Sequence, residues 1–261
     1  MSGHRLLASL WLVLAVGTGQ ALAADYKLVV GGHFASVLPA DDKAADISVV
    51  SFELRVAPVS NAEFLAFVTA HPVWQRDQVA RIFADDQYLS HWPMPGEIEG
   101  TQRDQPVTHV SWFAAQAFCE SEGARLPTWS EWEFAAAADA TRKDARSDPA
   151  WREQILSWYS RPSNSPLATV GGGPANIYGI RNLHGLVWEW VDDFNALLVS
   201  VDSRDQSDPD RLKFCGAGAM SLRDLDNYAV LMRIAMLSAL KASDTTANVG
   251  FRCTKIGREK S

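Results

Sequence analysis

The sequence is poor in cysteine, in positive charge and in long apolar runs. It has three cysteines in 261 residues, and an odd number means that at least one thiol stays unpaired or pairs with another molecule. The formal net charge is -7. Nucleic-acid binding needs clustered Lys and Arg to neutralise phosphates, so we expect no nucleic-acid partner. The chain also lacks a Pro/Gly/Ser linker or charge block, which indicates a single large domain.

One apolar run is present, at the N-terminus. Leu6 to Val16 follow a mildly basic start and are too few to span a bilayer comfortably. Ala21-Leu22-Ala23 fits a secretory cleavage site, so residues 1–23 read as a signal peptide. The alternative is an uncleaved N-terminal anchor. We expect a mature protein that is periplasmic or secreted, with no stable membrane span after cleavage.

Aromatic residues are abundant. Ten tryptophans indicate a loop-rich fold in which large side chains fill the space that regular elements leave open. Alternating apolar residues predict strands over 26–34 and 47–56, and the aperiodic stretch 76–106 reads as an ordered loop. A short strand is expected at 107–112.

Three short helices are predicted from their N-caps. Ser60 with Glu63 and Thr128 with Glu131 have capping-box spacing, and Ser111 can cap a helix between them. No regular βαβ alternation connects these elements, so a doubly wound sheet is not expected.

Six segments in order resemble the sulfatase-modifying-factor family, the formylglycine-generating enzymes and their relatives. The segments are GGHF, PVSNAEFLAFV, PVTHVSWFAAQAFC, ARLPTWSEWEFAAAA, NIYGIRNLHGLVWEW and NVGFRC, spread over residues 31–253. The resemblance implies an α+β, loop-rich fold similar to that of C-type lectins. It places this domain at residues 24–256, followed by a short polar tail at 257–261.

The same resemblance implies a structural disulfide between Cys119 and Cys253, which occupy cysteine positions of two family motifs. An oxidising compartment favours that bond. The alternative is two buried free thiols. Cys215 is then left unbridged.

A calcium loop of the family resembles the segment 182–190. Carried over, the ligands are Asn182, Glu189 and the backbone carbonyls of Gly185 and Val187. Calcium accepts six to eight oxygens, which suits this set. The family usually has Asn after the Gly, where this chain has Leu186. The alternative is a tight turn with Glu189 hydrogen-bonded to backbone.

The copper site of the oxidising family members has no counterpart here. Those members hold copper on two cysteines five positions apart, because soft thiolates suit Cu(I). Two possible alignments place the pair at Asp224 and Ala229, or at Ser221 and Asp226. Neither recovers a cysteine, so copper is not expected.

A polar cluster remains in that region. It reads as either a ligand pocket or a solvated loop face, and its candidate residues are Ser221, Arg223, Asp224, Asp226, Asn227, Tyr228 and Arg233. Some relatives bind iron through three histidines, but no two mature histidines have ligand spacing on one element, so iron is unsupported. His109 is expected to be a hydrogen-bonded structural residue.

Two classes of function are open. The first is an exported maturation or accessory factor, a scaffold with altered or no oxidase activity that binds a protein or peptide. The second is an active metal-dependent oxidase acting on a peptide or siderophore-like substrate. The missing cysteine pair favours the first.

Overall fold

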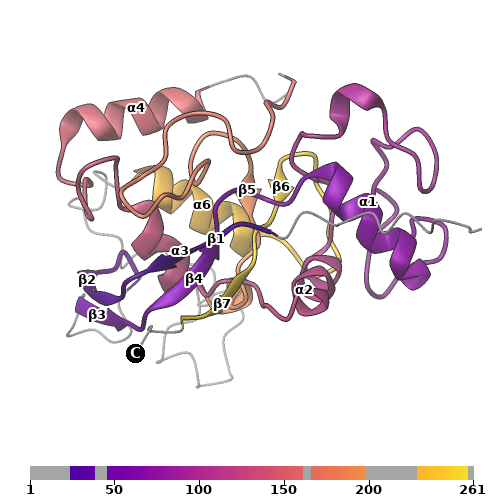
Figure 1. Ribbon diagram of the computed structural model, residues 1–261, viewed down its shortest axis with the longest axis horizontal. Coiled ribbons are helices and arrows are strands. Elements are labelled where there is room, and N and C mark those ends of the chain that lie inside the picture. Colours follow the sequence, from indigo (N-terminus) through magenta and orange to yellow (C-terminus); the bar gives the residue numbers. More distant parts are fainter. Residues whose placement is uncertain (1–23, 39–45, 161–165, 198–227, 258–261) are drawn as a thin grey trace, which may run out of the picture.

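In the part of the chain that the structure describes, short helices and three small sheets are connected by loops (Figure 1). The computed structural model describes residues 24–38, 46–160, 166–197 and 228–257. One sheet has the antiparallel order β1-β4-β7, one pairs β2 with β3, and one pairs β5 with β6 in parallel. The strands are β1 (Tyr26–Val29), β2 (Gly32–Ala35), β3 (Asp46–Val49), β4 (Phe52–Arg55), β5 (Trp188–Glu189), β6 (Val249–Gly250) and β7 (Thr254–Ile256). This mixture confirms the α+β class.

Each of the two strands expected near the N-terminus is divided in two. Val29 pairs with Phe52 in one sheet, whereas Gly32 pairs with Val49 in the other. Gly31 lies at the break, and a Cβ there would approach the Val49 carbonyl oxygen to 2.1 Å. Only glycine allows the two backbones to come this close, so the break is specified by the sequence.

The three capped helices are confirmed. They are α1 (Asn61–Ala70), α2 (Trp112–Ser121) and α3 (Trp129–Ala136). The Ser60 and Thr128 side chains each accept a hydrogen bond from a backbone N–H of the first turn, and both capping boxes are complete. Ser111 caps α2 in the same way. Short 3-10 turns lie at η1 (Pro72–Trp74), η2 (Gly100–Gln102) and η3 (Phe194–Ala196).

The strand expected at 107–112 does not form. His109 has a positive φ of 51°, which interrupts an extended backbone. Its N–H donates to the Thr246 carbonyl and its own carbonyl accepts from the Leu89 N–H, 2.8 and 2.9 Å away. Two loops therefore take the hydrogen bonds that a neighbouring strand would otherwise supply.

Two further helices were not predicted. Asp148 caps α4 (Pro149–Tyr159), and Pro149 occupies the first turn, where its missing N–H has no cost. The apolar helix α6 (Tyr228–Ser238) lies behind the sheets in Figure 1. No helix among residues 24–38, 46–160, 166–197 and 228–257 is long and apolar enough to cross a bilayer. The signal-peptide prediction concerns residues outside the described part.

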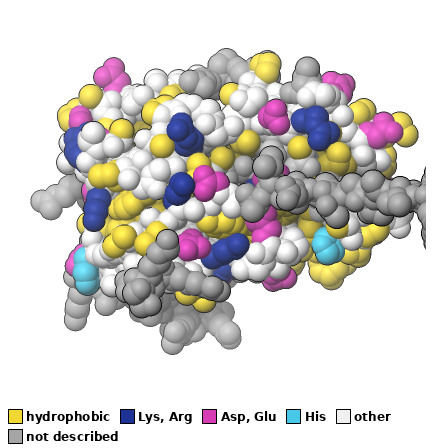
Figure 2. All heavy atoms as spheres, in the orientation of Figure 1, with side chains coloured by type: hydrophobic (Ala, Val, Ile, Leu, Met, Phe, Trp, Pro, Cys, Tyr) yellow, Lys and Arg dark blue, Asp and Glu magenta, His cyan; other side chains and the backbone are white. Residues whose placement is uncertain are grey.

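Aromatic side chains dominate the core, as the tryptophan count predicts. The Phe64 ring contacts those of Phe118 and Phe251 at centroid distances of 5.8 and 6.0 Å, joining α1 and α2 to the segment before β7. Trp92, Trp132 and Trp190 are buried. On the face drawn in Figure 2, Lys and Arg side chains lie among Asp and Glu side chains and do not gather into one basic patch.

The ordered loop over 76–106 is held by a pair of stacked histidines. The rings of His91 and His109 lie 5.1 Å apart, and His91 Nε2 is 3.2 Å from the Asn61 side-chain oxygen. Ser90 Oγ is 3.3 Å from His109 Nδ1. The expectation that His109 is a hydrogen-bonded structural residue is therefore confirmed. Burial, with smaller contributions from His109 and Arg76, lowers the pKa of His91 to about 4.

His91 should make the fold sensitive to acid. Its pKa rises from about 4 in the folded protein to the ordinary 6.5 on unfolding, so the unfolded chain binds the proton more readily between these values. Stability from this residue is complete above pH 6.5 and declines as the pH falls toward 4. Between pH 7.5 and pH 5, His91→Gln should lose about 2 kcal/mol less stability than the wild type, as measured by urea unfolding.

The control is Gln78→Ala, an exposed residue of the same loop without a titratable side chain, which should keep the wild-type pH dependence. An unchanged pH dependence in His91→Gln would contradict this assignment.

Candidate functional site

At the centre of the site is a buried ion pair between β5 and the segment that follows β6. Glu189 on β5 and Arg252 after β6 are fully buried. Arg252 Nη2 lies 2.7 Å from Glu189 Oε1, and Arg252 Nε lies 2.8 Å from Oε2. The Trp132 indole N–H donates to the same Oε2 at 2.9 Å. Both carboxylate oxygens are therefore engaged, in the two-pronged geometry that makes arginine pairs strong.

A second arginine lies beside this pair. Arg233 of α6 is buried, donates from Nη2 to the Glu189 carbonyl oxygen, and stacks over the Trp132 ring with its guanidinium carbon 3.6 Å from the ring centroid. A cation over an indole face is attracted by the ring's quadrupole. The ring of Trp132 thus has a charged group on its face and a carboxylate at its N–H.

His184 lies between this centre and the surface. Its ring meets those of Trp132 and Trp151 edge-on at 5.6 and 5.7 Å, and its Nε2 is 2.9 Å from the Ala136 carbonyl oxygen. Burial lowers the pKa of His184 to about 4, and the nearby Arg233 contributes in the same direction. The ring is therefore neutral near pH 7, and its Nε2 hydrogen is donated to the carbonyl.

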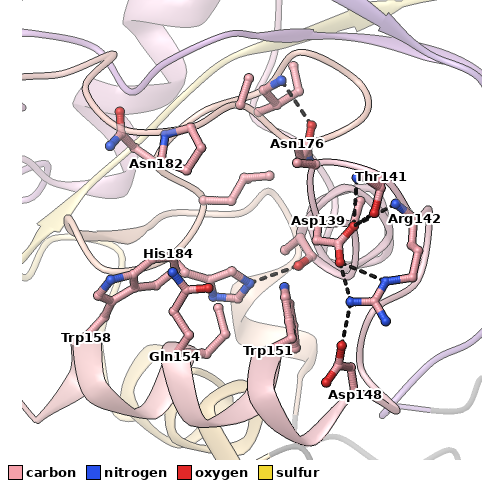
Figure 3. A pocket seen from close by; sticks show the side chains of 18 of the residues that line it. Asp139, Thr141, Arg142, Asp148, Trp151, Gln154, Trp158, Asn176, Asn182 and His184 are labelled. Atoms are coloured by element: carbon pink, nitrogen blue, oxygen red, sulfur yellow. Dashed lines mark hydrogen bonds and ion pairs between the residues drawn. The ribbon is translucent and has the colours of Figure 1, made fainter.

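A cavity of about 380 Å³ lies above His184 (Figure 3). Helix α4 forms one wall, and the turn after α3 and the loop before His184 form the others. At the rim, Arg142 donates to Asp139 at 2.5 Å and to Asp148 at 2.7 Å. The hydrogen bonds from Arg142 hold the pKa of Asp139 well below its usual range. This volume is within the range of small-molecule and peptide side-chain sites.

The wall from α4 presents one helix face. Trp151, Gln154 and Trp158 all line the cavity. Their spacing of three and then four residues places them on the same side of a helix. In Figure 3 the Gln154 side chain extends between the two tryptophans. Gly185 lies against Trp158: its φ is 82°, and a Cβ there would be 2.8 Å from the indole.

The residues proposed for calcium do not form an oxygen cage in this structure. Both oxygens of Glu189 are occupied by Arg252 and Trp132. Asn182, whose φ is 58°, accepts from the Gly171 N–H at 2.7 Å and so holds a neighbouring turn. A carboxylate already neutralised by a guanidinium is a poor ligand for a cation. Calcium binding by Asn182, Gly185, Val187 and Glu189 stays a prediction that these contacts do not favour.

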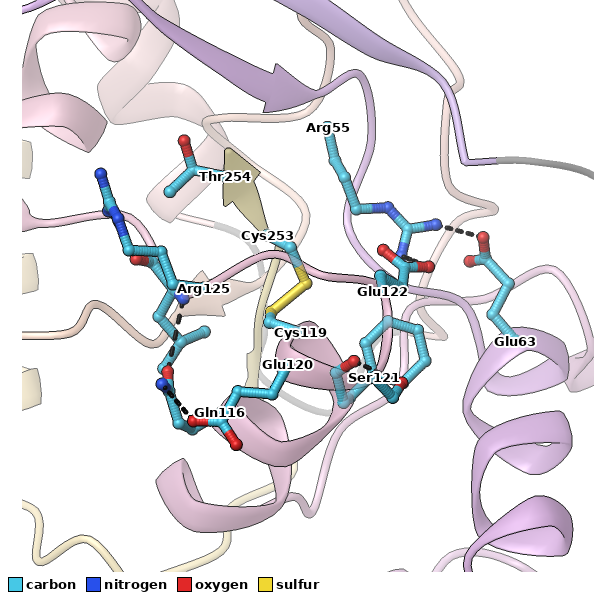
Figure 4. The surroundings of a disulfide bond; sticks show 12 residues. Arg55, Glu63, Gln116, Cys119, Glu120, Ser121, Glu122, Arg125, Cys253 and Thr254 are labelled. Atoms are coloured by element: carbon cyan, nitrogen blue, oxygen red, sulfur yellow. Dashed lines mark hydrogen bonds and ion pairs between the residues drawn. A yellow bond between two sulfur atoms is a disulfide. The ribbon is translucent and has the colours of Figure 1, made fainter. Parts of the chain in front are cut away.

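The structure joins Cys119 of α2 to Cys253 before β7 (Figure 4). The two residues are 134 positions apart, their Cα atoms are 5.4 Å apart, and both are fully buried. Arg125 and Thr254 hold the same two segments together, because each backbone N–H donates to the other residue's carbonyl. This is the pairing that the family resemblance implies.

Most residues of the expected polar cluster lie outside the part of the chain that the structure describes. Cys215 and five of the cluster residues lie outside the described residues, namely Ser221, Arg223, Asp224, Asp226 and Asn227. Tyr228 begins α6. Arg233 is found in the core beside Glu189, not on a solvated loop face. A pocket formed by the rest of this cluster stays a prediction.

Two features of the site escaped the sequence reasoning. The cavity wall from α4 could have been found from Asp148-Pro149, a typical cap followed by proline at the first helical position, and from the spacing of Trp151, Gln154 and Trp158. The Glu189–Arg252 pair had no local signal, because its members are 63 positions apart.

Comparisons with known proteins agree with this architecture. The family profile described as sulfatase-modifying factor enzyme 1-like domain matches residues 16–256. The chain is similar to the formylglycine-generating enzyme of Streptomyces coelicolor, 29% identical over an alignment of length 286 that covers 90% of this chain and 88% of that protein. It is also similar to the hercynine oxygenase of Mycobacterium tuberculosis, 32% identical over 162 residues, with coverage of 56% and 38%.

Among solved structures, the chain is similar in fold to CarF. The TM-score is 0.52 at 15% sequence identity, and the match covers 90% of this chain and 99% of that one. This likeness supports the loop-rich α+β fold.

Loss of the Cys119–Cys253 bond should destabilise the fold strongly. Cys119→Ala opens a loop of more than a hundred residues, and chain-entropy arguments assign such a loop about 4 to 5 kcal/mol. Urea unfolding measures the loss, with Cys215→Ala as a control that should behave as the wild type. Non-reducing peptide mapping that links Cys215 to either partner would refute the pairing.

Glu189→Gln should cost about 3 to 5 kcal/mol, because it leaves the buried Arg252 charge uncompensated. Exposed Glu97→Gln is the matched control and should change little. Melting curves with calcium or a chelator add the decisive comparison. If calcium raises the melting temperature of the wild type but not that of Glu189→Gln, then Glu189 binds calcium in addition to its ion pair with Arg252.

Proposed function

This chain belongs to the sulfatase-modifying factor enzyme 1-like family, and from that premise we propose that it is an exported maturation or accessory factor. It binds a protein or peptide and does not convert cysteine to formylglycine. Membership of the family and similarity to a formylglycine-generating enzyme support an accessory or oxidase-like role. The export signal and the sequence of the cysteine region support the finer statement.

The disulfide is the observation that carries this proposal. The chain has three cysteines, and Cys119 is joined to Cys253. Cys215 is then the remaining thiol. A thiolate pair on one chain, which suits Cu(I), needs two free cysteines. The side chains of Ser221, Asp224 and Asp226 offer hard oxygen ligands in place of sulfur, and Ala229 offers none.

The cavity beside α4 supports a binding role. It combines two indole rings with the amide of Gln154, and it opens at a rim of paired charges. Large apolar surfaces with a few polar groups are typical of ligand sites. Such a site can hold a peptide segment without any metal.

The second candidate is an active metal-dependent oxidase acting on a peptide or siderophore-like substrate. Similarity to a hercynine oxygenase favours it, because that relative is an oxygenase by name. Among the described residues, no group of three or more His, Cys, Asp or Glu side chains is arranged to hold a metal. Metal analysis of the purified protein separates the candidates: copper or iron at one equivalent supports the oxidase.

The purified protein should leave a sulfatase-type cysteine peptide unchanged. It is incubated with copper, a reductant and oxygen, and mass spectrometry follows loss of the thiol. The Streptomyces coelicolor relative is the positive control. Turnover above a no-protein control would overturn the proposal. Loss of that turnover in Cys215→Ala would then show that Cys215 takes part.

A further inference from the structure

The cavity-facing side of α4 has groups that the fold itself does not use. Among the described residues, no hydrogen bond engages the Gln154 amide or the indole N–H groups of Trp151 and Trp158. Gln154 is exposed, while Glu153 beside it points to a different side of the helix by its position in the sequence. These three side chains line the cavity together. They are available for a ligand that offers hydrogen-bond acceptors.

The spacing of the two indoles along α4 is close to the repeat length of an extended peptide helix. Trp151 and Trp158 are seven residues apart on α4, which corresponds to about 10.5 Å along the helix axis. A polyproline II helix has three residues per turn and advances about 9.3 Å in that turn. Residues one turn apart in such a peptide therefore meet successive tryptophans. Its backbone carbonyls have no internal partners and accept from indole and amide N–H groups.

The charges at the rim also fit an uncharged ligand. Arg142 is shared between Asp139 and Asp148, so its guanidinium is already paired and offers no strong attraction to an anion. The α4 wall of the cavity contributes two indole rings and the neutral amide of Gln154. Proline-containing segments bind with little loss of conformational entropy, because their backbone is ordered before binding.

We propose that the Trp151–Gln154–Trp158 face of α4 binds a proline-containing peptide segment in the polyproline II conformation. The two indoles contact the proline rings, and Gln154 donates to a peptide carbonyl between them. This inference rests on the proposed binding role and names the class of peptide. It assigns no chemistry to the cavity.

The probe is a blocked nonaproline peptide, titrated into the purified protein by calorimetry. The wild type should bind it at one site, and Gln154→Ala and Trp151→Leu should each weaken binding about tenfold, equivalent to about 1.4 kcal/mol. Glu153→Ala, next in sequence but off the cavity face, should bind as the wild type. Circular dichroism of each variant separates loss of the site from loss of the fold, and Gln154 is exposed enough to be replaced safely.

Absence of binding to the wild type at millimolar peptide would overturn the inference, as would equal binding by a folded Gln154→Ala variant. Chitotetraose is tested in parallel, because indole faces also stack on sugar rings. Binding of the sugar in place of nonaproline would likewise reject the peptide. The formylglycine assay does not depend on this face of α4. Loss of nonaproline binding would therefore leave the proposed function standing, and formylglycine formation would overturn the proposed function whatever the peptide result.

Discussion

The buried pair of Glu189 and Arg252 is the constraint around which the site is built. Removing two charges from water is costly, and only close contacts with both partners can offset that cost. Here Arg252 also donates to the carbonyls of Arg55 and Arg181, at 3.2 and 2.9 Å. One side chain thereby connects the end of β4, the loop before His184 and β5. These segments are far apart in sequence, so the pair fixes contacts that no local propensity could supply.

The same pair determines what the rest of the site can do. Both carboxylate oxygens of Glu189 accept hydrogen bonds, from Arg252 and from the Trp132 indole. The pair holds Trp132, whose ring carries Arg233 on its face and His184 at its edge. Toward the surface, the α4 wall adds indole and amide groups, and the paired charges of Asp139, Arg142 and Asp148 lie at the rim.

Local signals in the sequence predicted local structure well. Ser60, Ser111 and Thr128 each cap a predicted helix, and in the structure each helix begins at the residue that follows its cap. The failures involve partners distant in sequence. The Val107–Trp112 segment has strand-forming residues, yet His109 bonds to Leu89 and Thr246 in two loops and turns the backbone. The contact between Glu189 and Arg252 was not foreseen either, because the two residues belong to different motifs; the calcium role of Glu189 stays a prediction.

The contacts that stabilise the fold and the side chains of α4 that line the cavity come from different parts of the sequence. The Cys119–Cys253 bond, the Glu189–Arg252 pair and the caps of α1, α2 and α3 belong to the motif segments by which the family was identified, whereas α4 lies between two of these segments. Gln154 is exposed and supports no other described residue through its side chain, so replacing it has little effect on the packing. An exposed residue on a firmly held helix can therefore change what the cavity binds at almost no cost in stability.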